Sequence, residues 1–536
     1  MLFNSYEFIF VFLPVVLLGY IFLVRSGHRA VISWLAIASV AFYGYWKPAF
    51  LLVLAASILL NYLCSRLIVK AEDQSRWKRG VLLAGITCNL LLLAYYKYFF
   101  PLLSFLGEHG VFHRQWQNVL LPLGISFFTF TQIGYLIDLA QGEAKPQPLP
   151  NYILFVTFFP HLIAGPIFHH SEVMPQFAEE HRRVNLQDLV IGATWFIMGL
   201  FKKVAIADVM ANTADPAFAN PSALTFLAAW GGVLCYAMQL YFDFSGYSDM
   251  AIGMARMFSI EFPLNFDSPY KSRNITEYWQ RWHMTLTRYL NLYLYNPIAL
   301  WVSRRRMALG KKVSRKAAAT PEGFLNMIAF PTMTTMFLAG IWHGAGFQFL
   351  IFGLLHGTYL TIHQMWVISR QKHVGAKGAA PSPARSAVVA SVMLTFLCAV
   401  VGHVFFRSTN THNALLMLSS MMGAHGFALP TQLLHRLGPV GGAGLRSGVL
   451  LATHWSKADL RAALGLFASL IIVWALPNTQ QILGKYAHRD TTATGREATA
   501  RWNWQPGMLW AASFSVVLIV CLLLMQNPSR FLYFQF

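Results

Sequence analysis

Near one end of the sequence stands Phe8-Ile-Phe-Val-Phe-Leu-Pro-Val-Val-Leu-Leu-Gly-Tyr-Ile-Phe-Leu-Val24, an apolar stretch without a charged residue. A helix needs about 20 apolar residues to cross the hydrocarbon core of a bilayer. No basic segment precedes this stretch and no small-residue cleavage site follows it. We therefore predict a retained membrane helix and not a removable signal peptide.

Similar apolar runs recur along the chain and predict an all-α polytopic membrane protein. They lie near residues 8–24, 30–46, 49–65, 81–105, 118–140, 151–168, 187–207, 222–244, 323–342, 346–367, 386–405, 460–477 and 508–526. The composition agrees, because 56% of the 536 residues are hydrophobic and only 12% are charged. An ordinary soluble domain carries about twice that share of charged residues.

The distribution of basic residues argues against a nucleic-acid partner, although the formal net charge is +20. Lysines and arginines concentrate in short loops between apolar runs, as in residues 66–79. This pattern follows the positive-inside rule of membrane proteins. A nucleic-acid-binding protein would instead carry a basic face on a soluble fold.

The same rule predicts an incomplete crossing in the middle of the chain. If residues 66–79 lie in the cytoplasm, strict alternation places residues 245–320 outside. The basic cluster at 304–316 would then violate the rule. We therefore predict a re-entrant or partly buried segment within 222–300. Irregular backbone at membrane depth requires protein or a water-filled cavity around it. We therefore expect this segment to line a functional site.

Ionisable residues in membrane segments are candidates for function, and three stretches concentrate them. They are Tyr241-Phe-Asp-Phe-Ser-Gly-Tyr-Ser-Asp249, Ile275-Thr-Glu-Tyr-Trp-Gln-Arg-Trp-His283 and Gly340-Ile-Trp-His-Gly-Ala-Gly346. His343 stands among glycines between two apolar runs, which suits either a neutral general base or a hydrogen bond that closes a helix. His283 follows Glu277 and Arg281, a cluster that suits either base orientation and anion binding or an interfacial anchor.

Other polar residues favour structural roles. Asp243 and Asp249 fall on different faces of a helix, so we expect them to tie buried arginines or helix ends together. His161, His169 and His170 raise a metal hypothesis, but no further ligand stands at zinc-site spacing. The five cysteines lie in or beside apolar runs and show no metal-ligand spacing. We therefore expect no metal site.

Together, these stretches resemble the membrane-bound O-acyltransferase family, and within it the bacterial alginate O-acetyltransferase branch. Further matching motifs are Leu121-Pro-Leu-Gly-Ile-Ser-Phe-Phe128, Phe159-Pro-His-Leu-Ile-Ala-Gly-Pro166, Gln239–Gly253 and the closing Phe531-Leu-Tyr-Phe-Gln-Phe536. The resemblance implies a ring of about 11 to 13 transmembrane or re-entrant helices with a central funnel and tunnel. It also implies a catalytic core over residues 1–367, with 368–536 adding C-terminal helices and loops to the same membrane unit.

The resemblance also implies roles for individual residues. His343 of the Trp-His-Gly motif would be the catalytic base, and His283 the second essential residue. Acetyl-CoA would be the acyl donor, with no metal and no redox cofactor. Residues that bind substrate or support the site would be Trp342, Gly344, Arg281, Trp282, Asp243, Ser245, Asp249 and Glu277.

The function implied is transfer of acetyl groups from cytoplasmic acetyl-CoA to an extracytoplasmic polysaccharide, in a bacterial inner membrane. A periplasmic or membrane-anchored SGNH-type partner would complete the transfer. The stretch Asn296-Pro-Ile-Ala-Leu-Trp-Val-Ser-Arg-Arg-Arg306 departs from alginate relatives, which leaves alginate, cellulose, another exopolysaccharide or peptidoglycan open as the acceptor. The alternatives are a transporter of an acylated intermediate or glycan, and a structural membrane subunit.

Overall fold

A computed structural model of the chain is almost entirely helical. It describes all residues except Gln74, 109–119, Ala164, 179–183, 375–383, 448–449, 488–503, 526–531 and 533–536. Seven described segments are long and apolar enough to span a membrane: Phe8–Ser26, Phe50–Lys70, Arg76–Gly107, Leu186–Ala219, Pro321–His343, Arg385–Arg407 and Lys457–Ala475. The prediction of an all-α polytopic membrane protein is therefore confirmed. The ring with its funnel and tunnel stays a prediction, and the closing motif, apart from Leu532, lies outside the described residues.

The chain divides into two compact units. Unit 1 comprises Met1–Val204, Phe244–Asn265 and Thr479–Phe536, and unit 2 comprises Ala205–Asp243 and Phe266–Asn478. The long helix α12 (Phe226–Met257) contributes its first part to unit 2 and its second part to unit 1. The division into a core over 1–367 and a C-terminal part stays a prediction.

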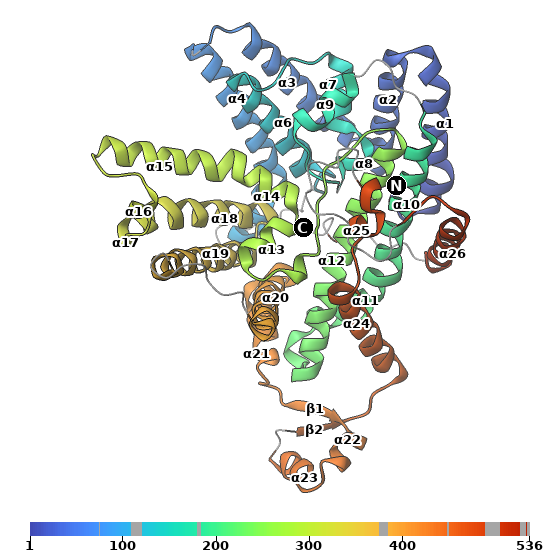
Figure 1. Ribbon diagram of the computed structural model, residues 1–536, viewed down its shortest axis with the longest axis vertical. Coiled ribbons are helices and arrows are strands. Elements are labelled where there is room, and N and C mark those ends of the chain that lie inside the picture. Colours follow the sequence, from blue (N-terminus) through green and yellow to red (C-terminus); the bar gives the residue numbers. More distant parts are fainter. Residues whose placement is uncertain are drawn as a thin grey trace. The chain divides into compact units, whose positions relative to one another are not determined.

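Unit 1 contains the first ten helices, the second part of α12 and two C-terminal helices (Figure 1). Their bounds are α1 Leu13–Leu23, α2 His28–Trp46, α3 Phe50–Lys70, α4 Arg76–Ala94, α5 Phe100–Glu108, α6 Ile125–Gln141, α7 Leu149–Thr157, α8 Phe159–Leu162, α9 His170–Ala178, α10 Leu186–Phe201, α25 Thr479–Leu483 and α26 Met508–Leu524. A π-helical turn, Phe8–Phe12, precedes α1 and extends it to the length of a span.

Buried amides connect four helices of unit 1. Asn61 of α3 and Asn89 of α4 exchange side-chain hydrogen bonds of 3.1 and 2.7 Å. Gln132 of α6 donates to Ser57 of α3 at 2.9 Å and accepts from Tyr152 of α7 at 3.1 Å. Between helices in a membrane such hydrogen bonds stabilise packing, because lipid offers the polar groups no alternative partner.

Glycines bring the backbones of α10 and α12 into direct contact. A Cβ atom on Gly253 would lie 2.5 Å from the carbonyl oxygen of Gly192, and one on Gly199 would lie 2.5 Å from that of Gly246. Both pairs are spaced by two helical turns, so they share one face of each helix. Small residues at such positions permit the close approach on which helix packing in membranes depends.

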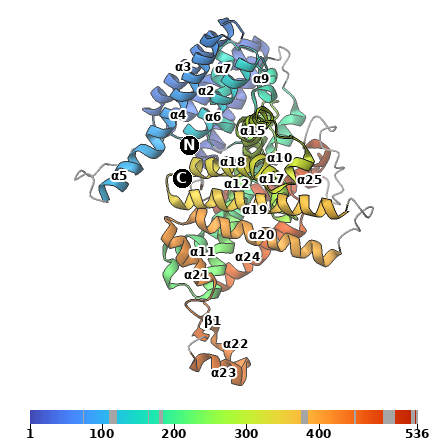
Figure 2. The ribbon, with the colours of Figure 1, turned by 90° about the vertical axis from the view of Figure 1, so that its left-hand side faces the viewer.

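Unit 2 contains the remaining elements. Their bounds are α11 Asp208–Ala219, α13 Ile275–Arg281, α14 Met284–Leu290, α15 Asn296–Ala308, α16 Arg315–Ala318, α17 Pro321–Phe324, α18 Phe330–His343, α19 Phe347–Val374, α20 Arg385–Arg407, α21 Thr411–Met421, β1 Phe427–Pro430, α22 Thr431–Arg436, α23 Gly438–Arg446, β2 Leu450–Thr453 and α24 Lys457–Ala475. Helices α18, α19 and α20 run side by side (Figure 2). The parallel pair β1 and β2 lies with α22 and α23 beyond the ends of α21 and α24 (Figure 1).

Two segments interrupt the helical pattern. Residues 258–283 contain no helix longer than the seven-residue α13, which is about 10 Å long and too short to cross a bilayer. Because the 32-residue α12 also lies within 222–300, the re-entrant segment stays a prediction. The apolar run 151–168 is likewise not one helix, because α7 ends at Thr157 and Pro160 opens the short α8.

We predict that the substitution Gly253→Ala destabilises the protein by about 1–3 kcal/mol, since the added methyl group must push α10 and α12 apart. Gly231→Ala is the matched control, because Gly231 lies in the same helix and a Cβ atom added there would meet nothing within 4 Å. The control should be neutral or slightly stabilising. Thermal unfolding of both purified variants in detergent measures the difference, and equal midpoints would contradict the packing described.

Candidate active site

His343 is the last residue of α18 and is buried, with 5% of its surface exposed. Its ring lies 4.7 Å from that of Trp342, 5.0 Å from Phe406 of α20 and 5.7 Å from Phe352 of α19, measured between centroids. The imidazole therefore stands at a helix end within an aromatic enclosure. Such an enclosure limits the access of water to the ring.

Glycines hold α18 against α19 beside His343. A Cβ atom on Gly340 would lie 2.5 Å from the carbonyl oxygen of Phe349, and one on Gly353 would clash with the carbonyl oxygen of Met336. Gly344, the residue after His343, leaves no room for a side chain because the ring of Phe349 occupies that position. The glycines of this stretch thus fix where the imidazole is presented.

His283 has a left-handed backbone conformation, with φ 43° and ψ 53°, between α13 and α14. Its side chain is almost fully buried, and its ring stacks at 6.5 Å on Phe266. Burial lowers the pKa of His283, so the ring is neutral near pH 7. A non-glycine residue in this conformation is strained, and such strain tends to be kept where it positions a functional group.

Arg281 stabilises the turn between α13 and α14 through contacts with Glu277 and Asp267. Its guanidinium lies 2.8 Å from a carboxylate oxygen of Glu277 and donates to the backbone oxygen of Asp267 at 3.1 Å. The backbone N–H of Asp267 donates in return to the carbonyl of Arg281 at 2.9 Å. These contacts give Arg281 and Glu277 a role in positioning the 267–283 loop.

Trp282 packs in a column of aromatic rings. It stacks on Tyr278 at 5.8 Å and on Tyr270 at 6.2 Å, and it meets the edge of Phe266 at 5.1 Å. Offset and edge contacts of this kind stabilise a buried aromatic cluster beyond the burial of area alone. The column holds the residue that precedes His283.

Two further histidines, not predicted as site residues, connect α13, which precedes His283, with helices α19 and α20, which pack around His343. His356 of α19 accepts a hydrogen bond from the indole of Trp279 in α13 at 3.3 Å, and its ring lies 4.7 Å from that of Phe352. His403 of α20 pairs with the hydroxyl of Tyr278 at 3.4 Å. Each histidine interrupts an apolar run, which is the signal that would have identified it.

The predicted residues of α12 do not form an acid–base pair. Asp243 and Ser245 are buried, and Asp243 belongs to unit 2. Asp249 belongs to unit 1, where its carboxylate lies 2.6 Å from the ammonium of Lys202 and accepts from Thr479 at 2.6 Å. Asp249 therefore pairs with a partly buried lysine, where the sequence predicts a buried arginine or a helix end.

Comparison with known proteins gives consistent matches. The family described as membrane-bound O-acyltransferase matches residues 109–312. The peptidoglycan O-acetyltransferase of Helicobacter pylori is 37% identical over 80% of this chain and 81% of its own. The probable alginate O-acetylase AlgI of Pseudomonas aeruginosa is 37% identical over 85% and 80%. The teichoic acid D-alanyltransferase of Bacillus subtilis is 26% identical over 62% and 80%.

We predict that the free energy of unfolding of His283→Gly exceeds that of His283→Ala by about 1 kcal/mol. Both variants lose the imidazole, but only the alanine side chain is strained in the left-handed conformation. At His363, in the regular helix α19, the same two substitutions should rank in the opposite order. Unfolding midpoints of the four purified variants test this. The same order at both positions would refute a strained backbone at His283.

Proposed function

Because the chain belongs to the membrane-bound O-acyltransferase family, we propose that it moves acetyl groups from cytoplasmic acetyl-CoA to an extracytoplasmic polysaccharide. The chain is an acyltransferase of the alginate O-acetylase-like branch. The observation that carries the proposal is its 37% identity, over most of both chains, to relatives named O-acetyltransferase and O-acetylase.

In the proposed reaction His343 acts as general base. Its neutral imidazole takes the proton of an acceptor hydroxyl, and the oxygen attacks the carbonyl carbon of the acetyl thioester. The tetrahedral intermediate collapses with cleavage of the carbon–sulfur bond, and the protonated imidazole returns its proton to the departing thiolate. The products are an acetyl ester and free coenzyme A, and the step requires no metal or redox cofactor.

The oxyanion of the intermediate requires hydrogen-bond donors. We assign this role to the indole N–H of Trp342 and to the backbone amides that follow Gly344, because the Gly344 N–H itself donates to the carbonyl of Ile341 at 3.1 Å. The fixed aromatic and glycine contacts of the α18–α19 turn support the assignment, because donors that are already oriented cost no rearrangement during reaction.

His283 is the second proposed catalytic residue. Its buried, neutral ring and the strained turn that holds it support this role. Trp282, Arg281 and Glu277 are positioning residues for that turn. Asp243 is proposed to support the site within unit 2, and Ser245 and Asp249 to support the part of α12 that belongs to unit 1, where Asp249 pairs with Lys202.

The location and partner follow from the same proposal. We place the protein in a bacterial inner membrane, where acetyl-CoA is available on one side and the polysaccharide on the other. A periplasmic or membrane-anchored SGNH-type protein would complete transfer to the polymer. Because relatives named for peptidoglycan and for alginate are both 37% identical, the polymer itself is left for the experiment to identify.

We predict that His343→Ala abolishes ester-linked acetate on envelope polysaccharide, reducing it to the level of a strain that lacks the protein. The measurement is the acetate that mild base releases from each purified polymer. The amount of the protein in the membrane is measured in parallel, so that loss of activity is distinguished from loss of the protein. His412→Ala is the control, because His412 is an exposed histidine in α21. It should leave the ester-linked acetate unchanged.

Two outcomes would count against the proposal. If ester-linked acetate is the same with and without the protein, the polysaccharide assignment is wrong. If deletion removes the acetate but His343→Ala at normal abundance does not, His343 is not the base.

A further inference from the structure

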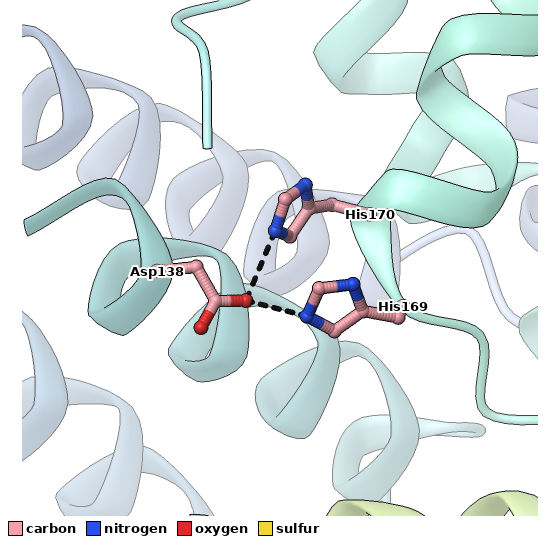
Figure 3. A group of neighbouring side chains, drawn as sticks. All are labelled: Asp138, His169 and His170. Atoms are coloured by element: carbon pink, nitrogen blue, oxygen red, sulfur yellow. Dashed lines mark ion pairs between the residues drawn. The ribbon is translucent and has the colours of Figure 1, made fainter. Parts of the chain in front are cut away.

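Three side chains from separate parts of the sequence meet in unit 1. Asp138 lies near the end of α6, His169 directly precedes α9, and His170 is the first residue of α9. One potential ligand atom from each lies within 4.8 Å of the other two. Figure 3 shows both imidazoles directed at the same carboxylate oxygen, with Nε2–Oδ2 distances of 2.8 Å for His169 and 3.0 Å for His170.

The ring of His169 is oriented by a neighbour. Its Nδ1 lies 2.6 Å from the hydroxyl oxygen of Ser171, and this contact leaves Nε2 to face Asp138. The backbone N–H of Ser171 also donates to Nδ1, at 3.3 Å. Metal binding at Nε2 would place the ring proton on Nδ1, which would then donate to the Ser171 hydroxyl. Metal-binding histidines in proteins commonly have a hydrogen bond of this kind at the second ring nitrogen.

His170 supplies an independent observation. It is 7% exposed, and its Nε2 makes no hydrogen bond of acceptable geometry to any residue that the structure describes, although Asp138 lies within ion-pair distance. A buried polar atom without a hydrogen bond is costly, and native proteins rarely keep one without a reason. The lone pair of a neutral imidazole at this position is available to a cation.

The donor set defines the class of cation. Two imidazole nitrogens and a carboxylate oxygen suit Zn²⁺ and other divalent first-row transition metals, whereas Mg²⁺ and Ca²⁺ prefer oxygen ligands alone. Ligand atoms about 2.0–2.1 Å from a tetrahedral ion lie about 3.3 Å apart. The observed 2.8 and 3.0 Å separations are short of this by only a few tenths of an ångström.

We propose that Asp138, His169 and His170 bind one divalent transition-metal ion of the zinc class, with water as a further ligand. The ion would join the end of α6 to the beginning of α9 and so stabilise unit 1. This role is separate from the acyl transfer assigned to His343 and His283, which belong to unit 2. The sequence predicts no metal site, because no further ligand stands at zinc-site spacing from the histidines. Asp138 lies on a different helix, far from them in the chain, and spacing alone does not reveal it.

The test is the metal content of full-length protein purified in detergent through a tag without histidine. Elemental analysis should find about one zinc-class ion per chain, at least tenfold less in Asp138→Asn and His170→Gln, and an unchanged content in His412→Ala. His412 is an exposed histidine of unit 2 and not one of the three proposed ligands, so it controls for adventitious binding. Equal metal loss in the control would overturn the proposal.

A second measurement does not depend on the variants being produced. After chelation, ZnCl₂ should raise the unfolding midpoint of the wild-type protein by several degrees, because a ligand that binds only the folded state stabilises it. MgCl₂ at the same concentration should have no effect. If ZnCl₂ does not shift the midpoint and the chelated protein takes up no metal, the three residues form an ion pair and the metal site is rejected.

Discussion

The close approach of helix backbones at glycine pairs is the constraint on which the rest of the structure depends. Lipid tails are as apolar as leucine, so helices in a membrane gain little from hydrophobic burial against each other and depend on contact and hydrogen bonds. Gly192 with Gly253 provides this contact in unit 1, and Gly340 with Gly353 provides it in unit 2. The second pair lies close to the end of α18 and holds that end, where His343 stands, against α19.

The sequence predicted the class of fold well because a bilayer imposes a length and a polarity on every helix that crosses it. It predicted the ends of helices less well. The apolar run 222–244 stops near the first carboxylate, yet α12 continues to Met257. Asp249 can lie inside this helix because Lys202 neutralises it, and a partner so far away in the chain leaves no trace in local hydropathy.

The candidate site shows the same limit. Family motifs identified His343 and His283, but not the link between them through His356, which depends on the packing of α19 against α13. The left-handed backbone conformation of His283 could not be predicted from the sequence either. Glycine and asparagine are the residues that usually adopt this conformation, and histidine gives no such signal. Local patterns thus identified the reactive groups, while tertiary contacts determine how those groups are held.

The Lys202–Asp249 pair also has a consequence for biogenesis. Lys202 leaves the ribosome before Asp249, and Thr479, which bonds the same carboxylate, is made later still. Until α12 is complete, the ammonium of Lys202 lacks the carboxylate of Asp249 as a partner. During this time the long aliphatic side chain of Lys202 must extend so that its ammonium reaches water at the membrane surface. The contacts that hold the segment after α10 against α12 and Thr479 are therefore completed only after that segment has been translated.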